Sequence, residues 1–283
     1  MVRHMTMPST FIRMSLFDFV CHTSAAIVFF SSVWFLQELL FCGVPALSWS
    51  FLTASPEDFG RAGGVSPFIV ATLWIILLTS FIVVPIGFGA AVFLTEFVSP
   101  QSQFRKLMER AISILAGMPS IAFGLCGYSF FCQTCGLRVS LLSGALTLAC
   151  MVLPLFVRCV VDGILVVSEE DRLLAAALNL SQWSKLRYVI LPRASAAVSA
   201  AMVISLARAG AETSALIYTT GYMPRWPSHP LDAGRPLSVH VCELAMNVPG
   251  AERNAFGAAV VLVAVVTIAT VISRLIFPQH RPI

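Results

Sequence analysis

Charged residues are scarce in this chain of 283 residues. Asp, Glu, Lys and Arg together make up 11% of it, whereas soluble domains carry about 25%. Hydrophobic residues make up 58%, and the mean hydropathy is +0.86. The net charge of +4 is too small for a nucleic-acid-binding protein, and the charges are not distributed as such a protein requires. The composition predicts an all-α polytopic membrane protein that sits in a lipid bilayer and has no nucleic acid as a partner.

The sequence also lacks the short motifs of nucleotide-dependent and metal-dependent enzymes. It has no G-x-x-x-x-G-K-[ST] loop, no G-x-G-x-x-G and no H-E-x-x-H. Among eight cysteines there is one C-x-x-C, Cys132 to Cys135, which leaves a disulfide or metal role open but has no second pair or histidine cluster near it. We therefore expect the chain to be no enzyme and to bind no metal, ATP or other cofactor itself.

Six apolar stretches are long enough to cross a bilayer core of about 30 Å, which takes about 20 helical residues. They run near 19–41, 67–94, 111–132, 140–161, 194–218 and 254–277. Each must be helical, because lipid offers no partner to a free backbone group. No A-x-A cleavage site follows the first of them, so we expect residues 1–15 to be a tail and residues 16–283 to be one transmembrane domain.

The basic residues gather in alternate loops. If the N-terminus is cytoplasmic, twelve face inward, five face outward and Arg208 lies within a span. The twelve are Arg3, Arg13, Arg105, Lys106, Arg110, Arg158, Arg172, Lys185, Arg187, Arg193, Arg274 and Arg281, and the five are Arg61, Arg138, Arg225, Arg235 and Arg253. The positive-inside rule therefore predicts that both termini are cytoplasmic.

Two charged residues, Arg208 and Glu212, interrupt the apolar stretch 194–220. A charge at mid-bilayer depth costs roughly 2.5–3.5 kcal/mol on insertion scales, so it is kept where it is paired, faces an interior or acts on something that crosses. In a continuous helix the spacing puts both side chains on one face, about 6 Å apart along the axis. The arginine fork suits an oxyanion. A structural ion pair is the alternative to a place in a transport path, which we favour.

The loops differ in character. In the inner loop, acidic residues from Glu169 to Asp171 suit a helix N-terminus, and the alanine-rich run 173–178 favours a helix. Asn179 tolerates the left-handed conformation that ends a helix, so a second short helix is expected near Ser181. Such helices can enter a groove on a cytoplasmic partner, or lie on the membrane surface without one. The proline-rich outer loop 221–253 carries a possible short helix near 239–246, and it is either a docking site or a connector.

The inner loop resembles the EAA loop of ABC-importer permeases, whose pattern is E-A-A-x-x-x-G followed by L-P. With Pro192 as the proline, Asn179 stands at the glycine and Leu173 at the glutamate, and Leu174 and Ala175 stand at the alanines. Asparagine can still make the bend. Loss of the glutamate weakens the case for one salt bridge to the ATPase, although Glu170 lies near.

Other segments are similar to phosphate-importer permeases of the A type (PstA). Residues 115–125 read L-A-G-M-P-S-I-A-F-G-L where that family has L-A-G-I-P-S-I-V-F-G-L. Residues 208–213 read R-A-G-A-E-T where that family has R-A-x-G-E-T. Residues 94–96 match the end of the family pattern P-L-G-I-x-A-A-x-x-L-x-E. Residues 153–158 match the family pattern L-P-x-x-x-R. The resemblance runs from about residue 43 to the C-terminus.

The resemblance implies a type I ABC-importer (MetI-like) permease fold with six transmembrane helices, in the bacterial cytoplasmic (inner) membrane. It implies a second related permease, a cytoplasmic ATPase dimer that holds ATP and Mg, and an outer phosphate-binding protein. The loop 165–192 would carry the coupling helix that contacts the ATPase, through Glu170, Leu173, Ala175, Ala176, Asn179 and Trp183.

The substrate path implied by the resemblance is built around Arg208, which would present a positive charge to phosphate while Glu212 orients it. The other expected path residues are Thr213, Arg158, Pro119 and Ser120. Arg158 is either a second positive step or an ordinary inner anchor, and Pro119 either breaks its span or only kinks it. A permease for molybdate or sulfate is one alternative. A secondary carrier is another, but it predicts an inverted repeat and no coupling loop.

Overall fold

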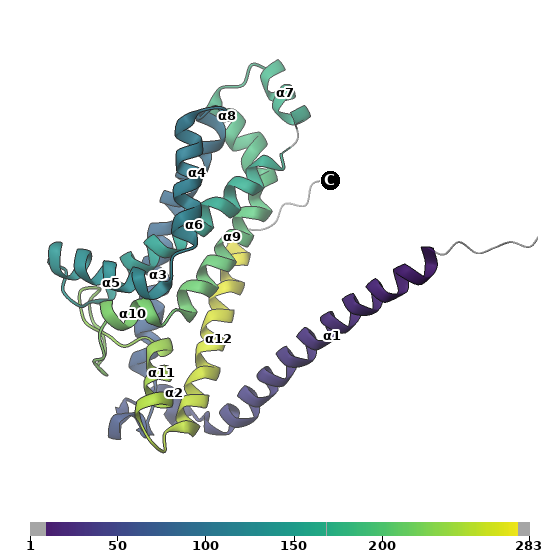
Figure 1. Ribbon diagram of the computed structural model, residues 1–283. Helices are drawn as coiled ribbons and strands as arrows, with labels where there is room; N and C mark the ends of the chain where they lie inside the picture. Colours follow the sequence, from purple (N-terminus) through teal and green to yellow (C-terminus); the bar gives the residue numbers. More distant parts are fainter. Residues whose placement is uncertain (1–9, 168, 277–283) are drawn as a thin grey trace, which may run out of the picture.

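The computed structural model describes residues 10–167 and 169–276 (Figure 1). The side chains of residues 10–16, 169, 172, 176 and 276 lie outside that description, as do residues 1–9 of the expected tail. Helix α1 already begins at Thr10. The elements are α1 (Thr10–Gly43), η1 (Val44–Ala46), α2 (Trp49–Thr53), β1 (Pro56–Glu57), η2 (Asp58–Gly60), β2 (Ala62–Gly63), α3 (Ser66–Val92), η3 (Phe93–Phe97), α4 (Gln103–Ala116), α5 (Ser120–Gly127), η4 (Tyr128–Thr134), α6 (Leu141–Leu165), α7 (Glu169–Ala177), α8 (Gln182–Lys185), η5 (Leu186–Ile190), α9 (Leu191–Ala211), α10 (Ser214–Thr219), α11 (Leu237–Asn247) and α12 (Glu252–Ile276).

The helices of the described residues confirm the six expected apolar stretches in order. Five continuous helices are long and apolar enough to cross a membrane, and there are six if the bent pair α4–α5 is one span. The five are Phe17–Ala46, Ser66–Phe97, Leu141–Leu165, Gln182–Ala211 and Glu252–Leu275. The fourth of these, built from α8, η5 and α9, is called the α8–α9 rod below. β1 and β2 form a small antiparallel hairpin, with Pro56 opposite Gly63.

Two of the expected spans differ in shape from a straight helix. The third, expected over 111–132, bends by 99° between α4 and α5. The fifth, expected over 194–218, ends at Ala211, and a separate short helix, α10, follows. Both interruptions lie within apolar sequence, where a broken helix leaves backbone groups that must find partners.

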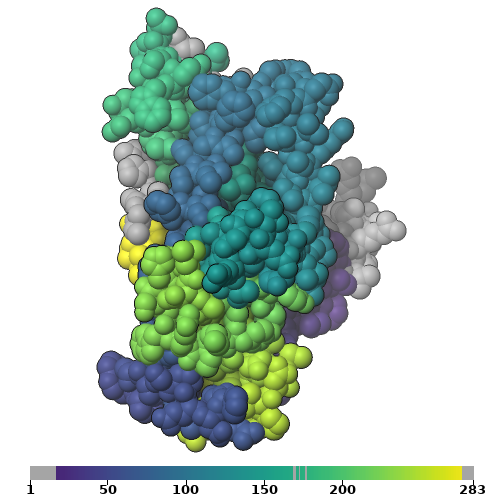
Figure 2. Space-filling model, turned by 90° about the vertical axis from the view of Figure 1, so that its left-hand side faces the viewer, coloured from purple at the N-terminus to yellow at the C-terminus, as the bar shows by residue number. Residues whose placement is uncertain are grey.

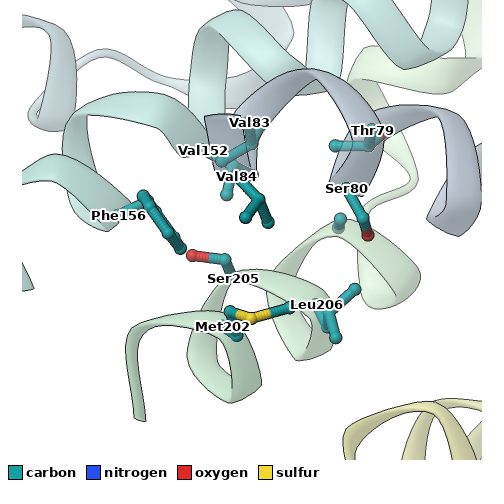
Figure 3. Close-up of a pocket in the computed structure, with 10 residues that line it drawn as sticks. Thr79, Ser80, Val83, Val84, Val152, Phe156, Met202, Ser205 and Leu206 are labelled. Carbon is teal, nitrogen blue, oxygen red and sulfur yellow. The ribbon is translucent and has the colours of Figure 1, made fainter. Parts of the chain in front are cut away.

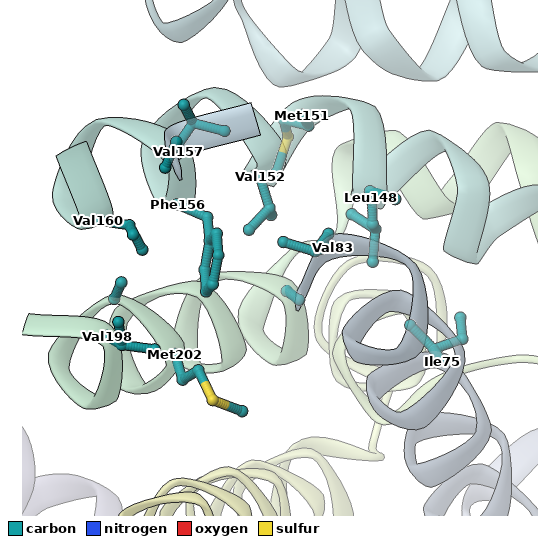
Figure 4. Packing of buried hydrophobic residues seen from close by; sticks show 14 of the residues in the cluster. Ile75, Val83, Leu148, Met151, Val152, Phe156, Val157, Val160, Val198 and Met202 are labelled. Atoms are coloured by element: carbon teal, nitrogen blue, oxygen red, sulfur yellow. The ribbon is translucent and has the colours of Figure 1, made fainter. Parts of the chain in front are cut away.

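The buried core lies where α3, α6 and α9 pack together (Figure 4). Phe156 of α6 is fully buried and points between the other two helices, near Val83 of α3 and Met202 of α9. Gly87 allows this approach, because a Cβ there would come within 2.5 Å of the Phe156 ring. The three helices therefore form a tightly packed frame on which the other elements are mounted.

Helix α1 stands away from this frame. Figure 1 shows it leaving the bundle near the end where α2 and α11 lie, and its side chains from 17 onward are nearly all exposed. Gly43 marks its contact with α12, since a Cβ there would meet the Phe256 carbonyl at 2.6 Å. At the opposite end of the bundle lie α7 and α8. We call these the α11 end and the α7–α8 end.

Candidate functional site

Two interrupted helices meet in the bundle. Pro119, with φ −60° and ψ 140°, separates α4 from α5, because a proline disfavours the helical conformation in the residue before it. Glu212, with φ −75° and ψ 130°, ends α9 in an extended conformation before α10 begins at Ser214. The break expected at Pro119 and Ser120 is confirmed, and it is a change of direction rather than a kink.

Helix α5 packs directly against α10 because Gly124 has no side chain. A Cβ at that position would lie 2.9 Å from the Cα of Ala215 and 3.1 Å from the carbonyl oxygen of Ser214. Figure 2 shows the segment around α5 lying against the segment that contains α10 and α11. This close approach brings the first turns of the two broken helices together.

A chain of hydroxyl groups joins the two breaks. Ser214 Oγ donates to Glu212 Oε1 over 2.9 Å, and Ser120 Oγ lies 2.6 Å from Ser214 Oγ. A hydroxyl has one proton to donate, so Ser120 is the donor to Ser214. In α11, Ser238 Oγ donates to the backbone carbonyl of Glu212 over 2.8 Å. Glu212 is thus fixed by α10 and α11 directly, and by α5 through Ser214.

The position of Glu212 suits a carboxylate. It lies at the start of α10, where the free N–H groups of a helix carry partial positive charge. The next residue, Thr213, accepts hydrogen bonds at its carbonyl from the backbone N–H groups of Leu216 and Ile217, both over 3.1 Å. The break therefore presents a half-buried carboxylate and several hydroxyls within an otherwise apolar part of the chain.

Arg208 lies on the exposed face of α9, whereas its neighbours Ser205 and Ala209 are buried. The continuous helix expected over this stretch is interrupted, because α9 ends at Ala211 and Glu212 is extended, and the placing of Arg208 and Glu212 on a common face stays a prediction. No ion pair joins Arg208 to Glu212, both of which the structure describes, and the carboxylate is held by a serine instead.

Arg158 lies far along the chain from these breaks, near the α7–α8 end of α6. It is exposed and lines a cleft of about 280 Å³ together with Arg105, Glu109 and Asp162. Arg105 Nε donates to Glu109 Oε1 over 2.8 Å. The cleft therefore holds two guanidinium groups and two carboxylates, and the structure does not bring Arg158 together with Arg208.

The inner loop folds as its residues predict. α7 begins at the acidic run, and Asn179 has a φ of +51°, the left-handed conformation that ends a helix. Ser181 caps α8, its hydroxyl accepting from the backbone N–H of Ser184. The predicted pair of short helices joined by a bend is therefore confirmed.

The expected ATPase-contact residues divide by exposure. Glu170 and Leu173 are exposed, and Trp183 is 67% exposed. Ala175 is only 2% exposed and packs inward within this chain, and its expected contact with the ATPase stays a prediction. The side chain of Ala176 lies outside the described residues. The accessible face of the loop carries the large apolar side chains of Leu173, Leu174, Leu178 and Trp183, beside exposed Ala177.

Among the residues that the structure describes, two ion pairs fasten this loop to the rest of the bundle. Lys185 Nζ of α8 lies 2.8 Å from Glu96 Oε2 in η3, and Arg193 of α9 pairs with Asp171 of α7. Sequence reasoning gave neither pair a role, because the partners are far apart in the chain. The available signal was Glu96 itself, an isolated acidic residue at the end of an apolar span.

A cavity inside the core is a poor candidate for a substrate path. It lies between α3, α6 and α9 (Figure 3) and measures about 10 Å³, room for roughly one water molecule. Its lining includes Ser205, whose hydroxyl is buried without a partner among the described residues. Neither Arg208 nor Glu212 lines it.

Comparison with known proteins decides the family. Residues 83–280 match the model of the family described as "Binding-protein-dependent transport system inner membrane component". The chain belongs to this family. The permease is 28% identical over 265 residues to the probable ABC transporter permease protein YqgI of Bacillus subtilis (strain 168), covering 88% of this chain and 90% of that protein. It is 30% identical over 198 residues to the phosphate transport system permease protein PstA of Haemophilus influenzae, covering 70% of each.

The fold agrees with this membership. An inward-facing structure of the MetNI methionine ABC transporter superposes with a TM-score of 0.60 at 17% identity, over 76% of the permease and 95% of that chain. The expected MetI-like permease fold is therefore confirmed. The permease is the membrane component of an ABC importer, a class in which ATP is hydrolysed by separate subunits and in which permeases work in pairs.

Proposed function

We propose that this permease moves inorganic phosphate into the cell across the bacterial cytoplasmic membrane by alternating access. A separate ATPase dimer holding ATP and Mg drives it, and an outer binding protein delivers the phosphate. Relatives such as that of Haemophilus influenzae are named phosphate transport permeases, and this supports the choice of substrate. The six ordered apolar segments support the membrane location.

The observation that carries the proposal is the exposed position of Arg208 on an apolar rod. Facing lipid, a guanidinium would be costly, so this face of α9 lies against a water-filled path or the second permease. A guanidinium binds oxyanions through a planar fork of N–H donors, which matches phosphate. Arg208 therefore offers the passing anion its positive charge.

Release of the anion needs binding that is not too strong. Glu212 is held by Ser214 and Ser238 and so keeps a fixed negative charge near the end of α9. In our proposal this charge limits how tightly Arg208 retains phosphate. Thr213, Pro119 and Ser120 line the adjoining breaks, and Arg158 is a second positive step near the α7–α8 end.

The α8–α9 rod links this site to the energy source. The inner loop lies at one end of the rod, and Arg208 lies close to the other. When the ATPase closes around ATP, it draws on α7 and α8, and the rod rocks as a rigid body, which exposes Arg208 to the opposite side. Leu173 and Trp183 are the exposed side chains that dock into the ATPase groove.

The same scheme orients the permease. The α7–α8 end faces the cytoplasm with both termini, in keeping with the excess of basic residues on that side. The α11 end faces the binding protein. Helix α1, exposed along nearly its whole described length beyond residue 16, lies against lipid and the second permease.

The test is uptake of labelled phosphate in cells that lack this gene, complemented with the native chain or with Arg208→Gln. We expect the native chain to restore uptake and Arg208→Gln to reduce it about tenfold or more, because hydrogen bonds to charged groups contribute about 1.5–3 kcal/mol. Arg274→Gln is the matched control, an exposed arginine on α12 far from the break, and it should transport normally.

Membrane levels of each variant are checked by immunoblotting. Molybdate and sulfate serve as competitors. If either abolishes phosphate uptake, or if loss of the gene leaves uptake unchanged, the substrate assignment falls and only the ABC permease remains. Equal uptake by Arg208→Gln and Arg274→Gln would remove Arg208 from the path.

A further inference from the structure

The ion pair between Lys185 and Glu96 joins two elements that are distant in sequence. Lys185 ends α8 in the inner loop, whereas Glu96 lies in η3, the π-helical turn that extends α3 at the α7–α8 end. The two charged atoms are 2.8 Å apart. The Glu96 side chain is only 4% exposed and that of Lys185 is 22% exposed. This is a largely buried contact between oppositely charged groups.

Burial makes such a contact resist separation. Separating two opposite charges that have little contact with water costs free energy, because solvent does not replace the lost attraction. Exposed surface pairs, by contrast, contribute little and break easily. The Lys185–Glu96 pair therefore acts as a fixed point between α8 and the end of α3.

The loop is also fastened on its other side. Arg193, at the start of α9, pairs with Asp171 in α7. Because α8 continues through η5 into α9, the loop, the rod and α3 are connected by this continuous helix together with the Lys185–Glu96 and Arg193–Asp171 pairs. In the core, α3 and α9 pack against α6, but that apolar contact lies beyond the loop.

We propose that the Lys185–Glu96 pair is the joint through which movement of the inner loop reaches α3. When the loop is drawn by the ATPase, α3 shifts together with the rod rather than being left behind. Lys185 and Glu96 are positioning residues that touch no substrate. This inference rests on the proposed function, since it assumes that an ATPase moves the loop.

Charge reversal separates this role from a merely structural one. Lys185→Glu, Glu96→Lys and the double variant are reconstituted in proteoliposomes with the second permease, the ATPase and the binding protein. The quantity measured is phosphate transported per ATP hydrolysed. We expect each single variant to lower this ratio about tenfold, which is typical of coupling between distant sites. The double variant restores the pair with its charges exchanged and should recover most of the ratio.

Lys106→Glu is the matched control, the same substitution at an exposed position on α4. It should leave the ratio unchanged. The joint is disproved if Lys185→Glu behaves like Lys106→Glu, or if assembled double variants are no better coupled than either single one. Loss of transport and hydrolysis in equal measure would likewise point to folding alone and overturn the proposal.

A second measurement is independent of the substrate. In the same proteoliposomes, which contain the ATPase, spin labels at exposed Ile86 of α3 and Leu178 beside α7 report the distance between helix and loop, in a background without native cysteines. With ATP added and then removed, the distance between the two labels should stay narrowly distributed in the native chain. In Lys185→Glu the distribution of that distance should become broader. If phosphate is the wrong substrate, uptake fails but this result stands. If the native distance also changes with ATP, the joint is disproved while the phosphate assignment is untouched.

Discussion

The two ends of the α8–α9 rod are held by different chemistry. At the α7–α8 end, full charges meet: Lys185 pairs with Glu96, and Arg193 pairs with Asp171. At the other end the contacts to Glu212 come from serine hydroxyls, and α5 and α10 touch through bare backbone at Gly124. One end is fastened by electrostatics and the other by close packing and neutral donors.

The cost of desolvating charges explains this difference. Lys185 and Arg193 keep part of their side chains in contact with solvent, so each gains its partner without losing all its hydration. Around the break in the apolar sequence, every further charge would be costly, and hydroxyl groups satisfy Glu212 instead. Substitutions should therefore act through charge at one end of the rod and through shape at the other.

The largest effect on stability is expected from Gly124→Ala. The added Cβ would lie 2.9 Å from the Ala215 Cα, and a backbone atom cannot move aside as a flexible side chain can. Forcing atoms into a packed contact costs typically about 1–3 kcal/mol. We expect a lower midpoint of thermal unfolding in detergent and impaired phosphate uptake, because α5 moves away from α10 and the hydroxyl chain opens.

Gly89→Ala is the control for this prediction. Gly89 lies in α3, and a Cβ there meets no atom within 4 Å. In a helix alanine is favoured over glycine by roughly 0.5–1 kcal/mol, so this variant should be as stable as the native chain or slightly more so. Equal stability of the two alanine variants would show that packing does not hold this end of the rod.

The inner loop could be predicted because its signals are local. Acidic residues at the start of α7, the alanine run and the left-handed Asn179 each act within a few residues, and they gave two short helices in the right places. Pro119 likewise predicted the break between α4 and α5. In both cases the physical cause lies in the residue itself or its immediate neighbours.

The end of α9 could not be predicted in this way. Neither proline nor a left-handed residue stands at Glu212, and its extended conformation is accompanied by bonds from Ser214 and from Ser238, which is 26 residues away. The Lys185–Glu96 pair spans 89 residues. Contacts of this kind depend on how the helices pack, which a single sequence does not specify.

Acid should destabilise the fold through His240, which lies in α11. His240 is 1% exposed and stacks on Phe68 with ring centroids 3.7 Å apart. Burial, and to a lesser degree the Arg235 charge, lower the pKa of His240 to about 3. The unfolded chain takes up a proton below its ordinary pKa of about 6.5 while the folded chain does not, so stability falls as the pH falls from 6.5 towards 3.

The expected loss is about 1 kcal/mol at pH 5.5 relative to neutral pH. The measurement is the midpoint of thermal unfolding at pH 7.5, 6.5 and 5.5. His240→Phe keeps an aromatic ring against Phe68 but cannot take up a proton, so its midpoint should depend less on pH. If the native chain and this variant respond alike, protonation of His240 does not govern the stability of α11.

The smallest effect is expected from Ser120→Ala. Its hydroxyl donates to Ser214, which still donates to Glu212 after the substitution, so the loss is one neutral hydrogen bond worth about 1 kcal/mol. Ser31→Ala on α1, which loses only a bond to its own helix, is the control for stability. A modest fall in the unfolding midpoint with near-normal uptake would show that Ser120 helps to hold Glu212 in place and does not contact the anion. Abolished uptake in a stable Ser120→Ala variant would instead mean that this hydroxyl meets the anion itself, and that the neutral end of the rod binds substrate as well as holding the helices.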